Sequence, residues 1–160
     1  MLKPIFSFIS VALMTLASGC AVQSVQPGAS REEVVSRYGT PSRVVALASG
    51  TRLQYSQQPA GQSAVMVDLD ATGRVTQVRE VLNPAGFSAV VVGQSTREDT
   101  LRALGRPAMV DRVASWPGDI LTYRWRDHDL DMLYWFYLDA SQVVQRTGQA
   151  AEIPIRANDN

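Results

Sequence analysis

Two short segments with apolar residues at helical spacing divide the chain into halves that follow the same plan. The apolar positions are Val34, Val35 and Tyr38 in the first segment, and Leu101 and Leu104 in the second. This spacing predicts one buried stripe on each helix. Helices of about nine residues are not stable alone in water, so each must pack on another element.

Four runs of strand-forming residues follow each predicted helix and indicate an antiparallel sheet. In one run, Val65, Val67 and Leu69 alternate with less apolar residues, which predicts one core face and one mixed face. The turn Asp70–Gly73 has Asp first and Gly last, as a hairpin favours. The expected strands are residues 43–47, 52–56, 63–69 and 74–81 in the first half, and 108–114, 120–126, 132–138 and 142–147 in the second.

The start of each helix is marked by a capping box. Ser30 with Glu33, and Ser95 with Glu98, have the required spacing. In such a box the hydroxyl accepts a hydrogen bond from a backbone N–H of the first turn, and the carboxylate reaches back to the N–H of the cap residue.

The end of each helix is expected at a glycine that is followed two places later by a proline. Gly39 and Gly105 enter positive φ at little cost, and Pro41 and Pro107 prevent the helix from resuming.

The two halves are predicted to be copies of one unit. Gly28 and Gly93 open the matching segments, and each is followed by a serine two places later. The later matches are Arg52–Tyr55 with Ile120–Tyr123, and Leu69–Ala71 with Leu138–Ala140. The offsets of 66, 68 and 69 residues are consistent with one repeat and small insertions. The predicted fold class is therefore α+β, with two tandem repeats, each a short capped helix packed on a small antiparallel β-sheet.

The first twenty residues are organised as an export signal. Lys3 precedes an apolar stretch from Ile5 to Ala17, and small residues lead to Cys20, the only cysteine. The stretch as a helix, at ~1.5 Å per residue, reaches about 20 Å, well short of a ~30 Å hydrocarbon core. A signal peptide is therefore favoured over a permanent transmembrane anchor.

The sequence Ala17-Ser18-Gly19-Cys20 resembles the lipobox of bacterial lipoproteins, with Ala17 where that family usually has Leu. The resemblance implies cleavage before Cys20 and acylation, with a fatty acid such as palmitate, of its thiol and new amino terminus. The alternative is an ordinary signal peptide with an incidental cysteine. Two or more acyl chains give stable membrane attachment. Ala21, in place of the Asp that goes with inner-membrane retention, implies the outer membrane.

The repeat itself resembles the SmpA/OmlA (BamE) lipoprotein domain. The matching positions are Gly28, Ser30, Val34, Gly39, Pro41 and Tyr55 in the first copy, and Gly93, Ser95, Leu101, Gly105, Pro107 and Tyr123 in the second. A one-residue slip leaves Thr100 where the apolar anchor, counted back from Gly105, is expected. The resemblance implies helices on a small antiparallel sheet and an accessory role in outer-membrane β-barrel assembly. Tandem copies also resemble the β-lactamase-inhibitor-protein architecture, which blocks enzymes with a concave sheet face.

The expected organisation has five parts. They are a lipoprotein signal peptide (residues 1–19), an acylated cysteine and tether (20–27), the first BamE-like repeat (28–82), a connector with the second repeat (83–147), and a flexible tail (148–160). The connector is expected to hold a short extra turn or strand that docks one repeat on the other.

Composition narrows the function. With 15 basic and 15 acidic residues and no net charge, the chain lacks the basic excess of a nucleic-acid-binding protein. One cysteine and one histidine exclude an intrachain disulfide and leave a zinc site short of ligands. No cofactor and no metal are expected.

Catalytic chemistry is sparse. In the segment 126–131, alternation places Asp127, Asp129 and Asp131 on one side and His128 on the other, so these side chains are not expected to converge. The segment is interpreted as a solvated hairpin connection. Asp70 belongs to a turn motif, so it is not expected to form a catalytic carboxylate pair with Asp68. No nucleophile-elbow, phosphate-loop or dinucleotide motif is present, and the protein is expected not to be an enzyme.

Aromatic residues are the stronger functional signal. Seven of the ten aromatic residues after Cys20 lie between Trp116 and Tyr137, and the strand 132–138 is apolar on both faces. Either the first repeat packs on this strand and buries both faces, or one row stays exposed as a partner surface. The candidate partner surface consists of Trp125, Tyr134, Trp135, Phe136, Arg124 and Arg126.

These observations predict a lipid-anchored protein on the periplasmic face of the outer membrane. It would serve as a protein-binding scaffold or accessory factor in envelope assembly, with envelope proteins such as the β-barrel assembly machine as partners. The alternative is an inhibitor-like module that binds and blocks an envelope enzyme.

Overall fold

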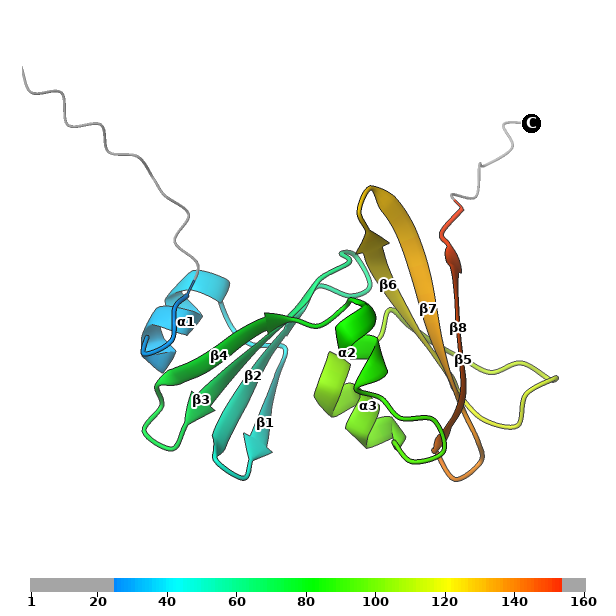
Figure 1. Cartoon of the computed structure of the whole chain (residues 1–160), viewed down its shortest axis with the longest axis horizontal. Coiled ribbons are helices and arrows are strands. Elements are labelled where there is room, and N and C mark those ends of the chain that lie inside the picture. The colour runs from blue at the N-terminus through cyan, green and yellow to red at the C-terminus, as the bar shows by residue number, and fades with distance from the viewer. Residues whose placement is uncertain (1–24, 154–160) are drawn as a thin grey trace, which may run out of the picture.

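The computed structural model describes residues 25–153, which form two four-stranded antiparallel sheets and three short helices (Figure 1). The protein is therefore α+β. The predicted signal peptide, the acylation site Cys20 and most of the tether lie outside the described residues, as do residues 154–160. Within the described range, no helix is both long enough and apolar enough to cross a membrane.

The N-terminal half (residues 25–82) contains one helix followed by a sheet in the order β1-β2-β3-β4. Each strand lies within two residues of the predicted bounds. The elements are α1 (Arg31–Tyr38), β1 (Arg43–Leu47), β2 (Gly50–Ser56), β3 (Ala64–Asp70) and β4 (Val75–Glu80).

The C-terminal half (residues 83–153) contains two helices followed by a sheet in the order β5-β6-β7-β8. The elements are α2 (Pro84–Ser88), α3 (Arg97–Leu104), β5 (Met109–Asp111), β6 (Ile120–Asp127), β7 (Leu130–Leu138) and β8 (Val144–Ala151). The connector thus forms the short helix α2. The predicted tail from residue 148 is wrong at its start, because residues 148–151 pair with β7 as part of β8.

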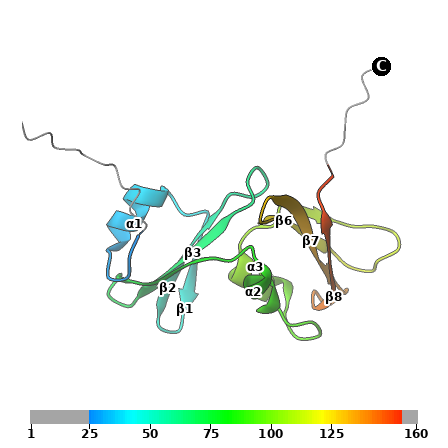
Figure 2. The ribbon, with the colours of Figure 1, turned by 45° about the horizontal axis from the view of Figure 1, so that its top comes forward.

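The elements form successive layers. The helix α1 covers one face of the first sheet, and α2 and α3 lie between the two sheets (Figure 2). The first core cluster joins α1 to that face and comprises Val34, Leu53, Val67, Leu69 and Val75. A second cluster extends from Ala64 and Met66 on the other face of the first sheet, through Phe87 and Leu104 on the helices, to Phe136 on the second sheet.

The capping box of α1 is confirmed. Ser30 Oγ accepts a hydrogen bond from the Glu33 N–H at 3.2 Å, and Glu33 Oε2 accepts one from the Ser30 N–H at 2.6 Å. Val34 is fully buried as expected, but Val35 is 37% exposed. The buried stripe is therefore narrower than predicted, because an eight-residue helix presents little more than one residue per turn to the sheet.

The second capping box lies one residue later than predicted. Thr96 is the cap and Asp99 its partner: the Asp99 N–H donates to Thr96 Oγ1 at 3.2 Å, and the Thr96 N–H donates to Asp99 Oδ2 at 2.9 Å. Ser95 Oγ instead accepts from the Val91 N–H, and Glu98 pairs with Arg43. Counted back from the glycine caps, both helices have eight residues, so the extra residue of the second half lies before its helix.

Because of this one-residue shift, Leu101 is not the buried apolar anchor that was predicted for the second helix. Thr100 holds the fully buried position that Val34 holds in α1, and its hydroxyl donates to the Thr96 carbonyl at 2.9 Å. That bond satisfies the buried hydroxyl within the helix itself. Leu101 is only half-buried, beside the first sheet.

The Asp-containing turns confirm the structural reading of Asp70. Its Oδ1 accepts from the backbone N–H groups of Thr72 and Arg74 at 2.8 and 2.9 Å. Asp139 Oδ1 does the same in the C-terminal half, toward the N–H groups of Ser141 and Val143. Both carboxylates hold a hairpin and are engaged in that role.

The first sheet caps the C-terminus of α3. Gln54 Nε2 donates to the carbonyls of Leu101 and Arg102 at 3.1 and 3.0 Å, and Arg52 Nη1 donates to the Arg102 carbonyl at 3.2 Å. The last carbonyls of a helix have no partner within it, and a positive charge near them also interacts favourably with the helix dipole. These contacts link the two halves.

An ion-pair network supports this cap. Arg52 donates from Nε and Nη2 to the two oxygens of Asp68 at 2.6 and 2.8 Å, and Arg79 Nη2 lies 3.1 Å from Asp68 Oδ2. Partial burial raises the pKa of Asp68, but the hydrogen bonds and charges of Arg52 and Arg79 outweigh this effect, so its pKa lies below the ordinary value.

Replacing Gln54 with Ala removes the side-chain donors to two carbonyls of α3. Because Gln54 is buried and its bonds to these carbonyls are partly buried, we expect the free energy of unfolding to fall by about 1–3 kcal/mol. Urea denaturation of Gln54→Ala measures the loss, with Gln77→Ala on the exposed surface of β4 as the matched control. Equal, small effects for both variants would show that the cap contributes little.

Acid should weaken the Asp68 network. An Asp with a lowered folded pKa contributes stability above its unfolded pKa of about 3.9, and this contribution is lost as the pH falls through the folded pKa. We therefore expect Asp68→Asn to be less stable than the wild type at pH 6 and to lose less further stability on acidification to pH 3. Urea midpoints at several pH values measure both slopes. The exposed control Gln77→Ala, which removes no titrating group, should keep the wild-type slope, and a wild-type slope in Asp68→Asn would contradict the assignment.

Candidate partner-binding face

The two faces of the second sheet carry different aromatic rows. Tyr123 and Trp125 on β6 share the inner face with Tyr134 and Phe136 on β7, as their pairing register requires. Phe87 of α2 packs on this row and stacks on Tyr134 with ring centroids 4.1 Å apart. This face is part of the core.

The predicted partner surface is therefore wrong in part. Trp125 and Phe136 are 3% and 0% exposed, so neither can form a surface in this conformation. Tyr134 is half-buried under Phe87. The helices α2 and α3 bury this row, whereas the sequence interpretation allowed for the first repeat to lie directly on the strand.

Trp135 lies on the opposite face, which no helix of the described residues covers. In both ribbon views the three helices lie on the other side of the second sheet (Figures 1 and 2). We call this surface the outer face, and its exposed or half-buried members are Met109, Trp116, Leu133, Trp135, Tyr137 and Arg146. Met109, on the edge strand β5, is 49% exposed.

Two aromatic rings of the outer face lie beside Gly148 of β8. A Cβ atom at Gly148 would stand 3.5 Å from Trp135 Cε3 and 3.9 Å from Tyr137 Cε2. Both rings therefore lie beside the backbone of the neighbouring strand.

A second group of rings extends the outer face at one end. Trp116 meets Tyr137 edge-on with centroids 5.3 Å apart, and Trp116 Nε1 donates to the Leu138 carbonyl at 2.6 Å. The Arg146 guanidinium lies 4.1 Å from the Tyr137 ring centroid and 5.2 Å from that of Trp116. Stacking of this kind places a cation against apolar surface.

Asp119 holds the loop that carries Trp116. Its oxygens accept from Arg112 Nε at 2.6 Å and Arg97 Nη1 at 2.5 Å, and its backbone carbonyl accepts from the Leu138 N–H. The hydrogen bond from Arg112, with the nearby charge of Arg97, outweighs desolvation and lowers the pKa of Asp119. Asp119 thus ties the loop to α3 through its carboxylate and to the end of β7 through its backbone carbonyl.

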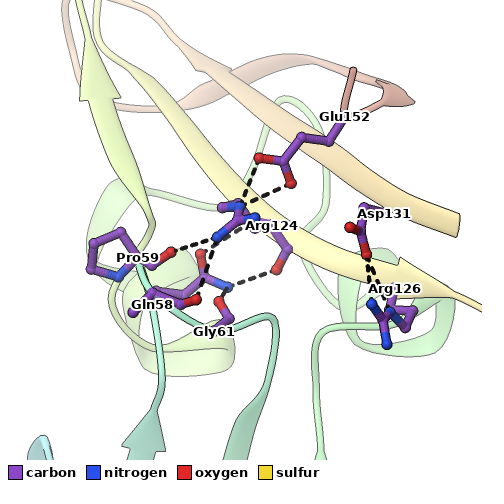
Figure 3. A network of polar contacts seen from close by, with 8 residues as sticks. Gln58, Pro59, Gly61, Arg124, Arg126, Asp131 and Glu152 are labelled. Atoms are coloured by element: carbon purple, nitrogen blue, oxygen red, sulfur yellow. Dashed lines mark hydrogen bonds and ion pairs between the residues drawn. The ribbon is translucent and has the colours of Figure 1, made fainter. Parts of the chain in front are cut away.

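Arg124 is used to join the halves. The side-chain amide of Gln58 accepts from the Arg124 N–H at 3.2 Å and donates to its carbonyl at 2.6 Å, as a neighbouring strand would (Figure 3). The Arg124 guanidinium donates to both oxygens of Glu152 at 2.9 Å and to the Pro59 carbonyl at 2.9 Å. Arg124 therefore holds the loop at Gln58 and Pro59 and the residue Glu152 against the second sheet.

The hairpin connection at residues 126–131 lies at the tip of the second sheet. Arg126 is exposed and pairs with Asp131 at 2.9 Å, while Asp127 pairs with His128 at 2.9 Å. Within the described residues, no three His, Cys, Asp or Glu side chains are grouped so that they could hold a metal ion.

The sequence interpretation missed most of the outer face. Leu133 and Tyr137 share the strand parity of Trp135, and this signal could have identified them. Met109, Trp116 and Arg146 come from other segments, and their arrival on this face depends on the strand register.

Comparisons with known proteins do not assign a function to this chain. No protein-family model matches the chain, and no curated protein matches it. Among solved structures, it is similar to the crystal structure of a DUF4309 family protein (YjgB) from Bacillus subtilis, with 18% identity over 77% of this chain and 78% of that one. The TM-score is 0.33, too low to carry a conclusion about fold or function.

Proposed function

We propose that the protein is a non-catalytic lipoprotein that binds a protein partner through the outer face of its second sheet. The outer face carries the proposal: Trp135 and Tyr137 remain half-exposed on a sheet surface with no covering helix in the described residues. Trp, Tyr and Arg are the residue types that dominate binding energy at protein interfaces. The lipobox-like segment ending at Cys20 supports a lipid anchor in the outer membrane, facing the periplasm.

We also propose that the two halves are tandem copies of a BamE-type domain. Each has a capped eight-residue helix before four antiparallel strands. The opening glycines make equivalent bonds: the Gly28 N–H donates to the Val75 carbonyl, and the Gly93 N–H donates to the Val144 carbonyl, both at 2.7 Å. The turns at Asp70 and Asp139 are also equivalent. These likenesses support a common unit.

The role that fits this proposal is a scaffold or accessory factor in envelope assembly. The resemblance to BamE favours outer-membrane β-barrel assembly as the process. The alternative function is that of an inhibitor-like module, and one observation favours it: the proposed binding surface is the open face of a sheet, as in the inhibitor architecture that the tandem copies resemble.

Trp135→Ala should abolish partner binding and leave the fold intact. Full-length protein is captured from its native membranes in mild detergent, and the proteins retained with it are identified. We expect the partner with the wild type and with Val44→Ala, an exposed position on the first sheet, and not with Trp135→Ala. Truncating a half-buried Trp should reduce stability by less than the ~3–5 kcal/mol expected for the core variant Phe136→Ala.

The recovered protein identifies the function. Subunits of the β-barrel assembly machine support the accessory role, whereas one envelope enzyme with suppressed activity supports the inhibitor role. The same partners with Trp135→Ala as with the wild type, or none with either, would contradict binding through the outer face.

A further inference from the structure

The strand β8 is an edge strand, and its second part is open. It stands last in the order of the second sheet. At its start, Val144 is covered, because its N–H donates to the Ser95 carbonyl at 2.9 Å and its carbonyl accepts from the Gly93 N–H. Beyond residue 146, no other strand of the described chain pairs with its outer side.

The backbone groups of this open part point away from the sheet at alternate residues. The Glu152 N–H donates to the Asp131 carbonyl at 2.8 Å, which fixes residue 152 as one that faces β7. Backbone direction alternates along an antiparallel strand, so the N–H and C=O groups of Thr147, Gln149 and Ala151 point outward. They form a regular row of donors and acceptors.

The open part lacks the usual protection of an edge. Native sheets shield their edges with charged residues, proline, bulges or a covering segment. The edge strand β4 of the first sheet ends in Arg79 and Glu80, whereas residues 147–151 of β8 contain no charge and no proline. The two halves thus differ at equivalent edges.

A cavity of about 410 Å³ opens beside the same edge. Phe87, Trp125 and Tyr134 form its aromatic wall, and Thr147 and Gln149 line its β8 side. Strand addition takes affinity from backbone hydrogen bonds and specificity from side-chain pockets beside the edge. The cavity has the position of such a pocket.

One charged group indicates what the cavity accepts. The indole N–H of Trp125 is buried and has no acceptor among the described residues, but it is a donor and therefore does not select a cation. Asp127, which also contacts His128 at the exposed hairpin tip, is the charged member of the described lining. A carboxylate beside aromatic faces favours a cationic side chain over an acidic one.

We propose that β8 receives an extended segment of a partner protein as a fifth strand of the second sheet, and that this segment places a Lys or Arg side chain in the cavity. The backbone of the segment pairs with Thr147, Gln149 and Ala151. Its cation lies against the aromatic wall near Asp127. This site is separate from the outer face and does not depend on the proposed function.

The test uses full-length protein in detergent micelles and a capped synthetic peptide of alternating threonine and valine with a central lysine. Nitrogen-15 NMR should show saturable shifts of the Gln149 and Ala151 amides and of the Trp125 indole N–H, with little change at Trp135. A peptide with glutamate at the centre should bind at least about tenfold more weakly, the cost of exchanging a favourable charge contact for a repulsive one. Asp127→Asn should reduce this preference.

Proline at an outward-pointing position separates strand addition from pocket binding. Gln149→Pro removes an outward N–H and no bond to β7, so the sheet should persist while peptide binding is lost. Gln149→Ala is the matched control and should bind. Ala151→Pro, nearer the end of the strand, makes the same test if Gln149→Pro does not fold.

Three results would overturn the proposal. The first is an unchanged spectrum at β8 with peptide present, and the second is binding that survives both proline variants. The third is a shift of the Trp125 indole by tetramethylammonium alone, without any peptide effect on β8, which would make the cavity a small-cation site. None of these results bears on capture of a partner through Trp135.

Discussion

The structure depends on the capture of α3 between the two sheets. A helix of eight residues cannot persist alone, and its last carbonyls need donors from elsewhere. Gln54 and Arg52 supply those donors from the first sheet, while the buried face of α3 packs toward the second sheet. Neither half completes this arrangement by itself, so the two halves form one structural unit.

This shared helix makes the two sheets unequal. The first sheet is covered by α1 on one face and by α3 on the other, so its mixed face, with Met66 and Gln54, is buried as well. The second sheet is covered by helices only on its inner face. The aromatic strand β7 is apolar on both faces, but it buries only one row and leaves the row of Trp135 half-exposed. A strand that served only the core would not need apolar residues in this second row.

Interactions between residues near one another in the sequence were enough to predict most elements, but not the contacts between distant segments. Ser30, Glu33 and Asp70 act within a few residues of their own positions, and their roles were predictable. Ser95 and Glu98 have the same spacing as Thr96 and Asp99, so spacing alone could not choose between the boxes; the pairing of Ser95 with Val91 and Val144 decides it. The inner aromatic row could not be chosen either, because both rows of β7 are apolar, and only the packing of α2 distinguishes them.

Gly148 links the two surfaces argued for the second sheet. On one side of β8 the rings of Trp135 and Tyr137 lie beside it, and on the other it lines the cavity with Trp125. Gly148 therefore lies between the outer face and the cavity. A segment added to β8 would also extend the sheet whose outer face carries Trp135. One partner that reaches around this edge could therefore use both surfaces, and their separate variants distinguish one interface from two.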